Sequence, residues 1–404
     1  MALPLRGIRV LDLGRLFAPA WATQLLGDLG ADIIKIERPK IGDIFRHYGP
    51  PFLTDKDGKQ TLESSYYISV NRNKRAITLD ISSPEGQQIT RDLAKTCHVL
   101  VENFKVGDLK RYGLDHDSIK AINPDIIYCS ITGFGQTGPY RKRPGTDSLF
   151  QAMSGLMSVT GEPDGEPNKV GLVIEDLVSG MYAAVGILAA LREKEVLGGK
   201  GQAIDIALLD SAMATMSHRA QDYLISGEVP QAMGSKTVGS VPAQIFQCSD
   251  GKINLQAGGD EDFKRLCAVI KRPELFEDER FSSRRKRVAN AHVLIPMLEE
   301  IFAQRSMNEW FEEMLAAGMM VGPIFNVKQA FENEQVIHRQ NAVEVPHPVS
   351  GKLKMVANPI RFSDTTLDRY EAPPTLGQHT AEVLKDVLGY DDAKIAALKA
   401  AKTI

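Results

Sequence analysis

Strand-like apolar runs alternate with helical segments along the first half of the chain, and this alternation restricts the fold more than any other feature. The apolar runs lie at 8–13, 33–36, 76–80, 99–101, 126–131 and 203–209. A helical repeat fills 21–29, Ser83 and Pro84 are typical of a helix start, and a long helix begins near Asp176. Such alternation is typical of a parallel sheet covered on both faces. We predict an α/β fold with a large, doubly wound, Rossmann-like domain.

The stretch 230–242 is rich in glycine, serine, threonine and valine and has no helical period, which marks a domain boundary. One strand-like segment and three helical segments follow it and predict a smaller α+β domain. Extended segments then return, and the tail is helical. The predicted divisions are a large domain over 1–225, a small domain over 226–333 and a C-terminal segment over 334–404.

Composition excludes several classes of protein. The chain has 404 residues, of which 43% are hydrophobic and 25% charged, as in globular proteins. A net charge of −3 favours neither nucleic acid nor anionic membrane as a partner. The longest apolar run, 181–191, is shorter than the roughly 20 residues of a membrane helix. The four cysteines lie far apart without metal-ligand spacing, and no signal peptide is recognised, so we expect a cytoplasmic protein without a metal site.

Two glycine-containing turns resemble nucleotide-binding loops but lack essential features. The turn that starts at Gly14 has no second glycine to let a pyrophosphate approach the following helix. The string Gly133-x-Gly135-x-x-Gly138 follows a predicted strand, but Pro139 comes next and no helix begins there. We therefore expect no nicotinamide or flavin cofactor.

Basic residues border several of the predicted strands. Arg38 follows the second strand, 71–75 precedes the third, Asn103 and Phe104 follow the fourth, and 141–143 follows the glycine string. Segments after parallel strands gather along one edge of a sheet, where ligands usually bind. These residues are candidates for holding a ligand with several phosphates, and Phe104 offers it an apolar surface. Solvated surface charge is the alternative for each of them.

Asp176 stands between apolar runs at a predicted helix start. The helix dipole and free N–H groups there favour an ionised carboxylate, which can serve as a covalent nucleophile without a separate base. A simple helix-capping role is the alternative. HExxH and GxSxG motifs are absent, which argues against a zinc protease and an α/β-hydrolase.

Over nearly its whole length the chain resembles the class III CoA-transferases, the family of formyl-CoA and carnitine CoA-transferases. Within this family it is most similar to the succinyl-CoA:glutarate branch, through the runs 69–74, 128–133 and 390–392. The other segments that carry the resemblance are 7–12, 30–38, 42–43, 73–75, 101–104, 133–139, 151–155 and 377–380.

The resemblance implies that Asp176 is the nucleophile of a CoA-transferase, acting through a mixed anhydride and an aspartyl-CoA thioester. It implies coenzyme A as part of the substrate, succinyl-CoA as donor, a dicarboxylate as acceptor and no metal. It also assigns Gly239 and Ser240 to an oxyanion-stabilising loop. The CoA-binding positions that it implies are Leu16, Ala18, Arg38, Lys74, Asn103, Phe104, Arg111 and Arg143.

The family architecture implies ring-shaped subunits interlocked in a homodimer, with the C-terminal part returning to the large domain. An acyl-CoA racemase of the same fold and a catalytically silent CoA-binding protein are the alternatives. Against the racemase, Thr146 occupies the place of its histidine. Phe17 and the loop 234–243 also depart from the family pattern, so acceptor preference can differ. Arg46 and His47 are candidates for meeting a second carboxylate, with plain surface exposure as the alternative.

Overall fold

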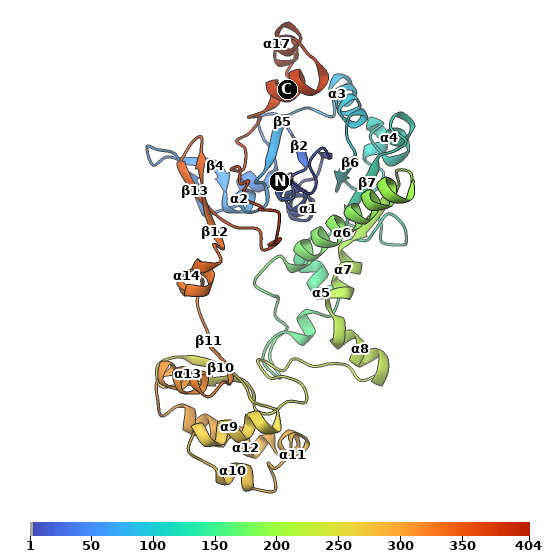
Figure 1. Cartoon of the computed structure of the whole chain (residues 1–404). Helices are drawn as coiled ribbons and strands as arrows, with labels where there is room; N and C mark the ends of the chain where they lie inside the picture. Colours follow the sequence, from blue (N-terminus) through green and yellow to red (C-terminus); the bar gives the residue numbers. More distant parts are fainter. Residues whose placement is uncertain (1–2) are drawn as a thin grey trace. The chain divides into compact units, whose positions relative to one another are not determined.

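The structure is a computed structural model that describes residues 3–404 (Figure 1). The chain forms two compact units. The first contains the chain up to Met157, Lys169–Glu228 and His338–Ile404, and the second contains Ser158–Asn168 and Val229–Ile337. The C-terminal segment is thus part of the first unit. Residues 158–168, which we assigned to the large domain, belong to the second unit because they bond to it, as Gly234 N–H does to the Gly161 carbonyl (2.7 Å).

A parallel sheet forms the centre of the first unit. Every neighbouring pair of strands in it is parallel, in the order β5-β2-β1-β6-β7-β8. This confirms the predicted α/β fold. The strands are β1 (Arg9–Asp12), β2 (Asp32–Glu37), β5 (Lys74–Thr78), β6 (Val99–Glu102), β7 (Ile127–Thr132) and β8 (Ala203–Ala207).

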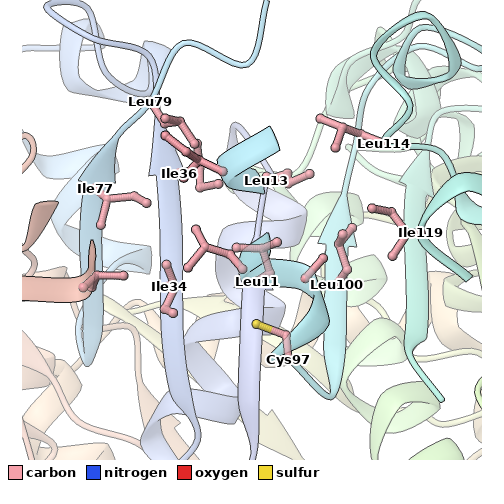
Figure 2. Packing of buried hydrophobic residues seen from close by; sticks show 14 of the residues in the cluster. Leu11, Leu13, Ile34, Ile36, Ile77, Leu79, Cys97, Leu100, Leu114 and Ile119 are labelled. Carbon is pink, nitrogen blue, oxygen red and sulfur yellow. The ribbon is translucent and has the colours of Figure 1, made fainter. Parts of the chain in front are cut away.

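Helices cover both faces of this sheet because alternate strand residues point to opposite sides. On one face Leu11, Ile34 and Leu100 pack against α3 (Pro84–Lys95), α4 (His116–Ile122), α16 (Thr380–Leu388) and α17 (Asp392–Ala400) (Figure 2). On the other face Val10 and Ile33 pack against three helices from the first half of the chain. These are α1 (Phe17–Asp28), α6 (Ile174–Leu197) and α7 (Leu208–Thr215).

Helix α6 is the longest described helix, and within residues 3–404 it alone has the length and composition to cross a membrane. Its Ala183 and Ile187 are fully buried against the sheet, and it packs on α1 and α7. These contacts are typical of the central helix of a globular domain.

The segment between β2 and β5 carries small elements that the sequence pattern did not predict. They are the 3-10 turn η1 (Ile44–His47), the hairpin strands β3 (Phe52–Thr54) and β4 (Gln60–Ser64), and α2 (Ser65–Val70). Leu53 and Ile68 pack on Val345 and Leu353 of the C-terminal hairpin. That hairpin comprises β12 (Ala342–His347) and β13 (Gly351–Val356). Two distant stretches of sequence are therefore joined in one unit.

Other short elements complete the first unit. They are the 3-10 turns η2 (Leu109–Tyr112) and η3 (Met157–Val159), which ends beyond the division between the units, and the helices α5 (Asp147–Met153) and α8 (Ser217–Ser226).

The second unit is built around an antiparallel sheet of β9 (Ala243–Gln247), β10 (Lys252–Gln256) and β11 (Met320–Pro323). Phe246, Phe302 and Trp310 form its aromatic core. Its helices are α9 (Asp260–Val269), α10 (Glu274–Glu277), α11 (Arg284–Ala289), α12 (Ala291–Phe302), α13 (Met307–Ala316) and α14 (Val327–Glu332); α15 (Glu334–His338) spans the return to the first unit.

Candidate active site

Asp176 lies in the first turn of α6 and is half-buried. The backbone N–H of Ala18, in the first turn of α1, lies close to its carboxylate and favours the charged form. The first N–H groups of a helix have no partner within that helix and carry the positive end of its dipole. The carboxylate therefore lies at the N-termini of two helices, which is a suitable place for an anionic nucleophile.

Gly180, one turn after Asp176, permits this arrangement. A Cβ atom at this position would lie 2.6 Å from the Ala18 carbonyl oxygen and 3.0 Å from Trp21 Cδ1. Only glycine lets α6 approach α1 so closely without displacing that backbone. Gly180 thus allows the first turns of α6, which carry Asp176, to lie against the first turn of α1.

Asp147 anchors the start of α6 from α5. Its Oδ2 accepts the backbone N–H groups of Glu175 (2.8 Å) and Asp176 (3.3 Å), and its Oδ1 accepts Gln151 Nε2 (2.6 Å). Gln151 in turn bonds to the Val170 N–H and the Leu172 carbonyl in the loop that leads into the helix. Asp147 therefore fixes the backbone that carries Asp176. Sequence reasoning missed it, because its partners lie about 28 positions away.

Burial, and then the negative charge of Asp147, raise the pKa of Asp176 to about 7. Burial and Asp147 also raise the pKa of Glu175 to about 7. The Glu175 side chain is fully buried, with Thr215 Oγ1 3.4 Å from Oε2. Asp176 therefore ionises at a higher pH than an exposed aspartate.

We predict that Asp147→Asn shifts the pH dependence of the catalysed reaction. If Asp176 acts as an anion, kcat/KM falls as pH drops below about 7, where Asp176 takes up a proton. Removing the Asp147 charge removes a repulsion that raises this pKa, so the acid limb should move to lower pH. The exposed Asp117→Asn is the matched control and should leave the limb in place. An unchanged limb in Asp147→Asn would contradict the assignment.

A cavity of about 490 Å³ lies at the carboxyl ends of β1, β2, β5 and β6. From β1 the chain proceeds outward through β2 and β5 and then returns to place β6 on the other side of β1. Ligands of open α/β sheets bind at such a switch point. Arg15, Arg38 and Arg111 line the cavity, and none of these three guanidinium groups forms a salt bridge with a carboxylate of residues 3–404. They can therefore hold an anionic ligand.

The structure brings some of the predicted CoA-binding residues to this cavity. Arg38, Phe104 and Arg111 line it directly. Asn103 supports its wall, because its side chain bonds to both the N–H and the carbonyl of Arg15 (2.9 and 2.5 Å). Leu16 and Ala18 do not line the cavity. They lie at the start of α1, where Ala18 is close to Asp176. Leu16 has a φ of 69°, an uncommon value for a non-glycine residue, and its side chain is exposed.

Lys74 does not reach this cavity. It opens β5, at the edge of the sheet opposite the cavity, and its ammonium group is buried. Its three donors are taken by Asp12 Oδ2 (3.3 Å), the Ala20 carbonyl (2.8 Å) and Asn71 Oδ1 (3.0 Å). The structure therefore does not support the prediction that Lys74 binds a CoA phosphate. Lys74 balances the buried charge of Asp12 beneath α1.

Arg143 is also separate from the cavity. Its guanidinium stacks on the Tyr140 ring at 3.6 Å and is exposed.

The candidates Gly239 and Ser240 belong to the second unit, whereas Asp176 belongs to the first. The Gly239 carbonyl accepts Arg284 Nε (2.7 Å), and the Ser240 N–H donates to the Thr237 carbonyl (3.3 Å).

Arg46 is buried, which corrects its interpretation as a candidate for a second substrate carboxylate. Its five N–H donors bond to Glu37, Glu63 and the Pro374 carbonyl at 2.7–2.9 Å. The guanidinium stacks on Tyr67 at 3.7 Å. No donor remains for a ligand. His47 is exposed, and its Nε2 lies 2.9 Å from the Ile41 carbonyl oxygen.

Arg15 is a cavity residue that the sequence analysis did not select. Its guanidinium lies 4.1 Å from the centre of the Phe104 ring, and partial burial lowers its pKa. Nothing in the local pattern distinguishes this arginine, because its contacts with Asn103 and Phe104 join positions about 88 residues apart.

Comparisons with known proteins identify the family. The sequence profile of CoA-transferase family III matches residues 5–380. The chain belongs to CoA-transferase family III. This family III enzyme is 41% identical to the human succinyl-CoA:glutarate CoA-transferase, over 99% of this chain and 90% of the relative. It is 40% identical to a succinate–glutarate CoA-transferase of Agrobacterium fabrum, over 95% of this chain and 96% of the relative.

Solved structures agree with this membership. A crystal structure of a CAIB/BAIF family protein from Brucella suis superposes on the family III enzyme with a TM-score of 0.86. The two are 39% identical, and the match covers 96% of this chain and all of the other. The resemblance described from the sequence motifs is thereby confirmed at the level of family and fold.

Proposed function

We propose that this enzyme transfers CoA from an acyl-CoA donor, in the first instance succinyl-CoA, to a dicarboxylic acid, with Asp176 as nucleophile. The observation that carries the proposal is the Asp176 carboxylate at the N-termini of α1 and α6, in a chain of CoA-transferase family III. The names of the human and Agrobacterium relatives support the choice of succinyl-CoA and a dicarboxylate.

The proposed reaction is a double displacement on the thioester. The Asp176 carboxylate attacks the acyl carbonyl, the C–S bond breaks, and a mixed anhydride and the CoA thiolate result. The thiolate then attacks the Asp176 carbonyl, which releases the donor acid and leaves an aspartyl-CoA thioester. The acceptor carboxylate repeats these two steps in reverse and departs as its CoA ester. One thioester replaces another, so the balance requires no ATP.

The groups around Asp176 suit these steps. The Ala18 N–H lies close to the carboxylate and can stabilise its oxygen while a carbonyl forms there. Asp147 keeps the backbone in place through both half-reactions. Gly239 and Ser240 remain proposed contributors to oxyanion stabilisation.

CoA is proposed to bind with its phosphates at Arg15, Arg38 and Arg111 and its adenosine against Phe104. Guanidinium groups suit phosphate through their permanent charge and their fork of donors. The stacking of Arg15 on Phe104 holds the Arg15 guanidinium group in a fixed orientation in the absence of ligand.

We predict that Arg111→Ala raises the KM for acyl-CoA about ten-fold or more and leaves kcat nearly unchanged, since a hydrogen bond to a charged group contributes about 1.5–3 kcal/mol. The loss should shrink at high ionic strength, because salt weakens the same interaction in the wild type. Steady-state kinetics at two salt concentrations measure both effects. Arg6→Ala, at an exposed arginine outside the cavity, is the control; an equal KM in Arg111→Ala and wild type would contradict this placement.

Mass spectrometry of the products tests the proposed function directly. Purified enzyme is mixed with succinyl-CoA and a panel of mono- and dicarboxylic acids, and new acyl-CoA esters are identified. We expect glutaryl-CoA or another dicarboxyl-CoA. Absence of every new ester would overturn the proposal.

A homodimer, interlocked as the family architecture implies, is part of the proposal. Helices α6, α7 and α8 expose a set of large apolar side chains that a monomer would leave in water. These are Met181, Tyr182, Val185, Leu197, Met213, Tyr223, Leu224 and Ile225, each 45–79% exposed. Light scattering should give twice the mass of one chain, and a monomer would contradict the proposal.

The four buried, unpaired cysteines support the proposed cytoplasmic location.

A further inference from the structure

The short turn between β1 and α1 joins the two parts of the proposed site. Arg15 belongs to this turn and lines the cavity, and Ala18, whose N–H group lies close to the Asp176 carboxylate, follows in the first turn of α1. We call residues 14–16 the connecting turn. A shift of its backbone would move both the guanidinium group and the N–H group.

Leu16, the last residue of the connecting turn, has a backbone conformation that is nearly exclusive to glycine. Its φ is 69° and its ψ is −157°. Such a conformation costs free energy in any other residue and persists only where the surrounding structure fixes it from several sides. The contacts around the connecting turn should therefore explain how it is held.

Two side chains hold the first part of the connecting turn. Asp12 Oδ1 accepts the Gly14 N–H (2.9 Å), and the Asn103 side chain bonds to the N–H and the carbonyl of Arg15. The Gly14 carbonyl and the Leu16 N–H are held by other groups.

Lys35 and Asp43 are those other groups. Lys35 Nζ donates to the Gly14 carbonyl (2.8 Å), and Asp43 Oδ1 accepts the Leu16 N–H (3.4 Å). The two side chains also form an ion pair, with Lys35 Nζ 3.0 Å from Asp43 Oδ2, and at most 1% of either is exposed. The pair therefore bonds to both ends of the connecting turn.

Strand β2 and the segment after it fix the ion pair in turn. Lys35 belongs to β2, and so does Glu37, whose Oε2 accepts the Asp43 N–H (2.8 Å). Asp43 Oδ1 also accepts the Phe45 N–H (3.0 Å). The central sheet thus determines where the connecting turn lies.

We propose that Lys35 and Asp43 are positioning residues for CoA transfer, which hold the connecting turn so that Arg15 meets the phosphates of CoA and the Ala18 N–H lies at the Asp176 carboxylate. The inference rests on the proposed function. Both residues act through the backbone of the turn, and neither is assigned a contact with the reacting atoms. One buried ion pair thereby serves the CoA cavity and the nucleophile together.

Three variants test this role. Lys35→Met removes the donor to Gly14 and leaves the buried Asp43 charge unpaired, so it should also lower stability. Asp43→Asn is nearly isosteric, but its one acceptor oxygen cannot serve both Lys35 and the Leu16 N–H. The double variant Lys35→Met/Asp43→Asn leaves no unpaired charge of this pair and keeps the net charge of the protein, so effects of charge at a distance largely cancel.

We expect each of the three variants to raise the KM for succinyl-CoA about 10-fold or more. The reason is that Arg15 loses its place at the phosphates, and a hydrogen bond to a charged group contributes about this much to binding. Steady-state kinetics with glutarate as acceptor measure the change, and thermal unfolding of each variant is recorded alongside.

The pH dependence of kcat/KM for succinyl-CoA reports on the nucleophile. The Ala18 N–H favours the charged form of Asp176, so its displacement should move the acid limb to higher pH. Asp147 on α5 and Glu175 on α6 also act on this carboxylate, and both are retained in all three variants. The expected shift is opposite to that in Asp147→Asn.

Asp28→Asn is the matched control. Asp28 lies at the other end of α1 and forms a comparably buried ion pair with Arg72 (2.5 Å). The same change of aspartate to asparagine should lower the unfolding temperature there, but leave the KM for succinyl-CoA and the acid limb in place.

The double variant separates positioning from folding. Its unfolding temperature should lie above that of Lys35→Met, while its KM and its acid limb stay changed. Recovery of the wild-type KM and limb in the double variant would overturn the proposal, and so would a wild-type limb in Asp43→Asn. If the wild type forms no new acyl-CoA ester from any acid, the proposed function itself fails, and the positioning role fails with it.

Discussion

Asp176→Asn is expected to lower kcat for CoA transfer by about 10³-fold or more. The amide has nearly the shape of the carboxylate and its oxygen can still lie beside the Ala18 N–H, but it lacks the charge needed to attack a thioester. Rates with succinyl-CoA and glutarate measure the loss. Asp176→Ala accompanies it, because an asparagine next to water can slowly revert to aspartate.

Covalent labelling separates loss of the nucleophile from loss of binding. Wild-type enzyme mixed with succinyl-CoA should gain the mass of CoA less one water on the peptide that contains Asp176, and neither variant should gain it. Both variants should bind CoA with nearly wild-type affinity, since the arginine-lined cavity does not include position 176. Full exchange activity in Asp176→Ala would show that another group carries the chemistry.

The parts of the fold that depend on local pattern could be predicted from the sequence. The β7 residues 127–131 form an apolar run that only Ser130 interrupts, and the strand is buried on both faces. Ser83 accepts the Gly86 N–H (3.0 Å) and Pro84 takes the first turn of α3, as their positions predicted. In such segments a few neighbouring residues determine the structure.

The site depended on contacts that no local pattern contains. Asp147 and the start of α6 are about 28 positions apart, and Arg46 and Pro374 are separated by 328. Arg38 and Arg46 look alike in the sequence, yet one lines a cavity and the other is enclosed by two glutamates. Tertiary packing decides which charge is free for a ligand, and the local sequence pattern carries no signal of that decision.

Arg46→Met is expected to destabilise the first unit by about 3–5 kcal/mol, because it removes the charge that neutralises two buried carboxylates, Glu37 and Glu63. The Tyr67 hydroxyl and the Pro374 carbonyl belong to the same network, so the C-terminal segment should loosen as well. Thermal unfolding of the whole protein measures the change. His47→Ala, at the exposed neighbouring position, is the control and should shift unfolding little.

The pH dependence of the stability of Arg46→Met, and two compensating substitutions added to it, distinguish this structural role from a role in substrate binding. In Arg46→Met the unpaired glutamates should have raised pKa values, so the lost stability should be smaller at pH 5 than at pH 8; stability is retained where these groups stay protonated and is lost as pH rises through their folded pKa. Adding Glu37→Gln and Glu63→Gln should restore part of the stability by removing the buried charges.

If Arg46 bound a substrate carboxylate, Arg46→Met would instead raise the KM for the acid while the unfolding temperature stayed constant. The five bonds that enclose Arg46 predict the opposite result: a protein that unfolds at a lower temperature whether or not an acid is present.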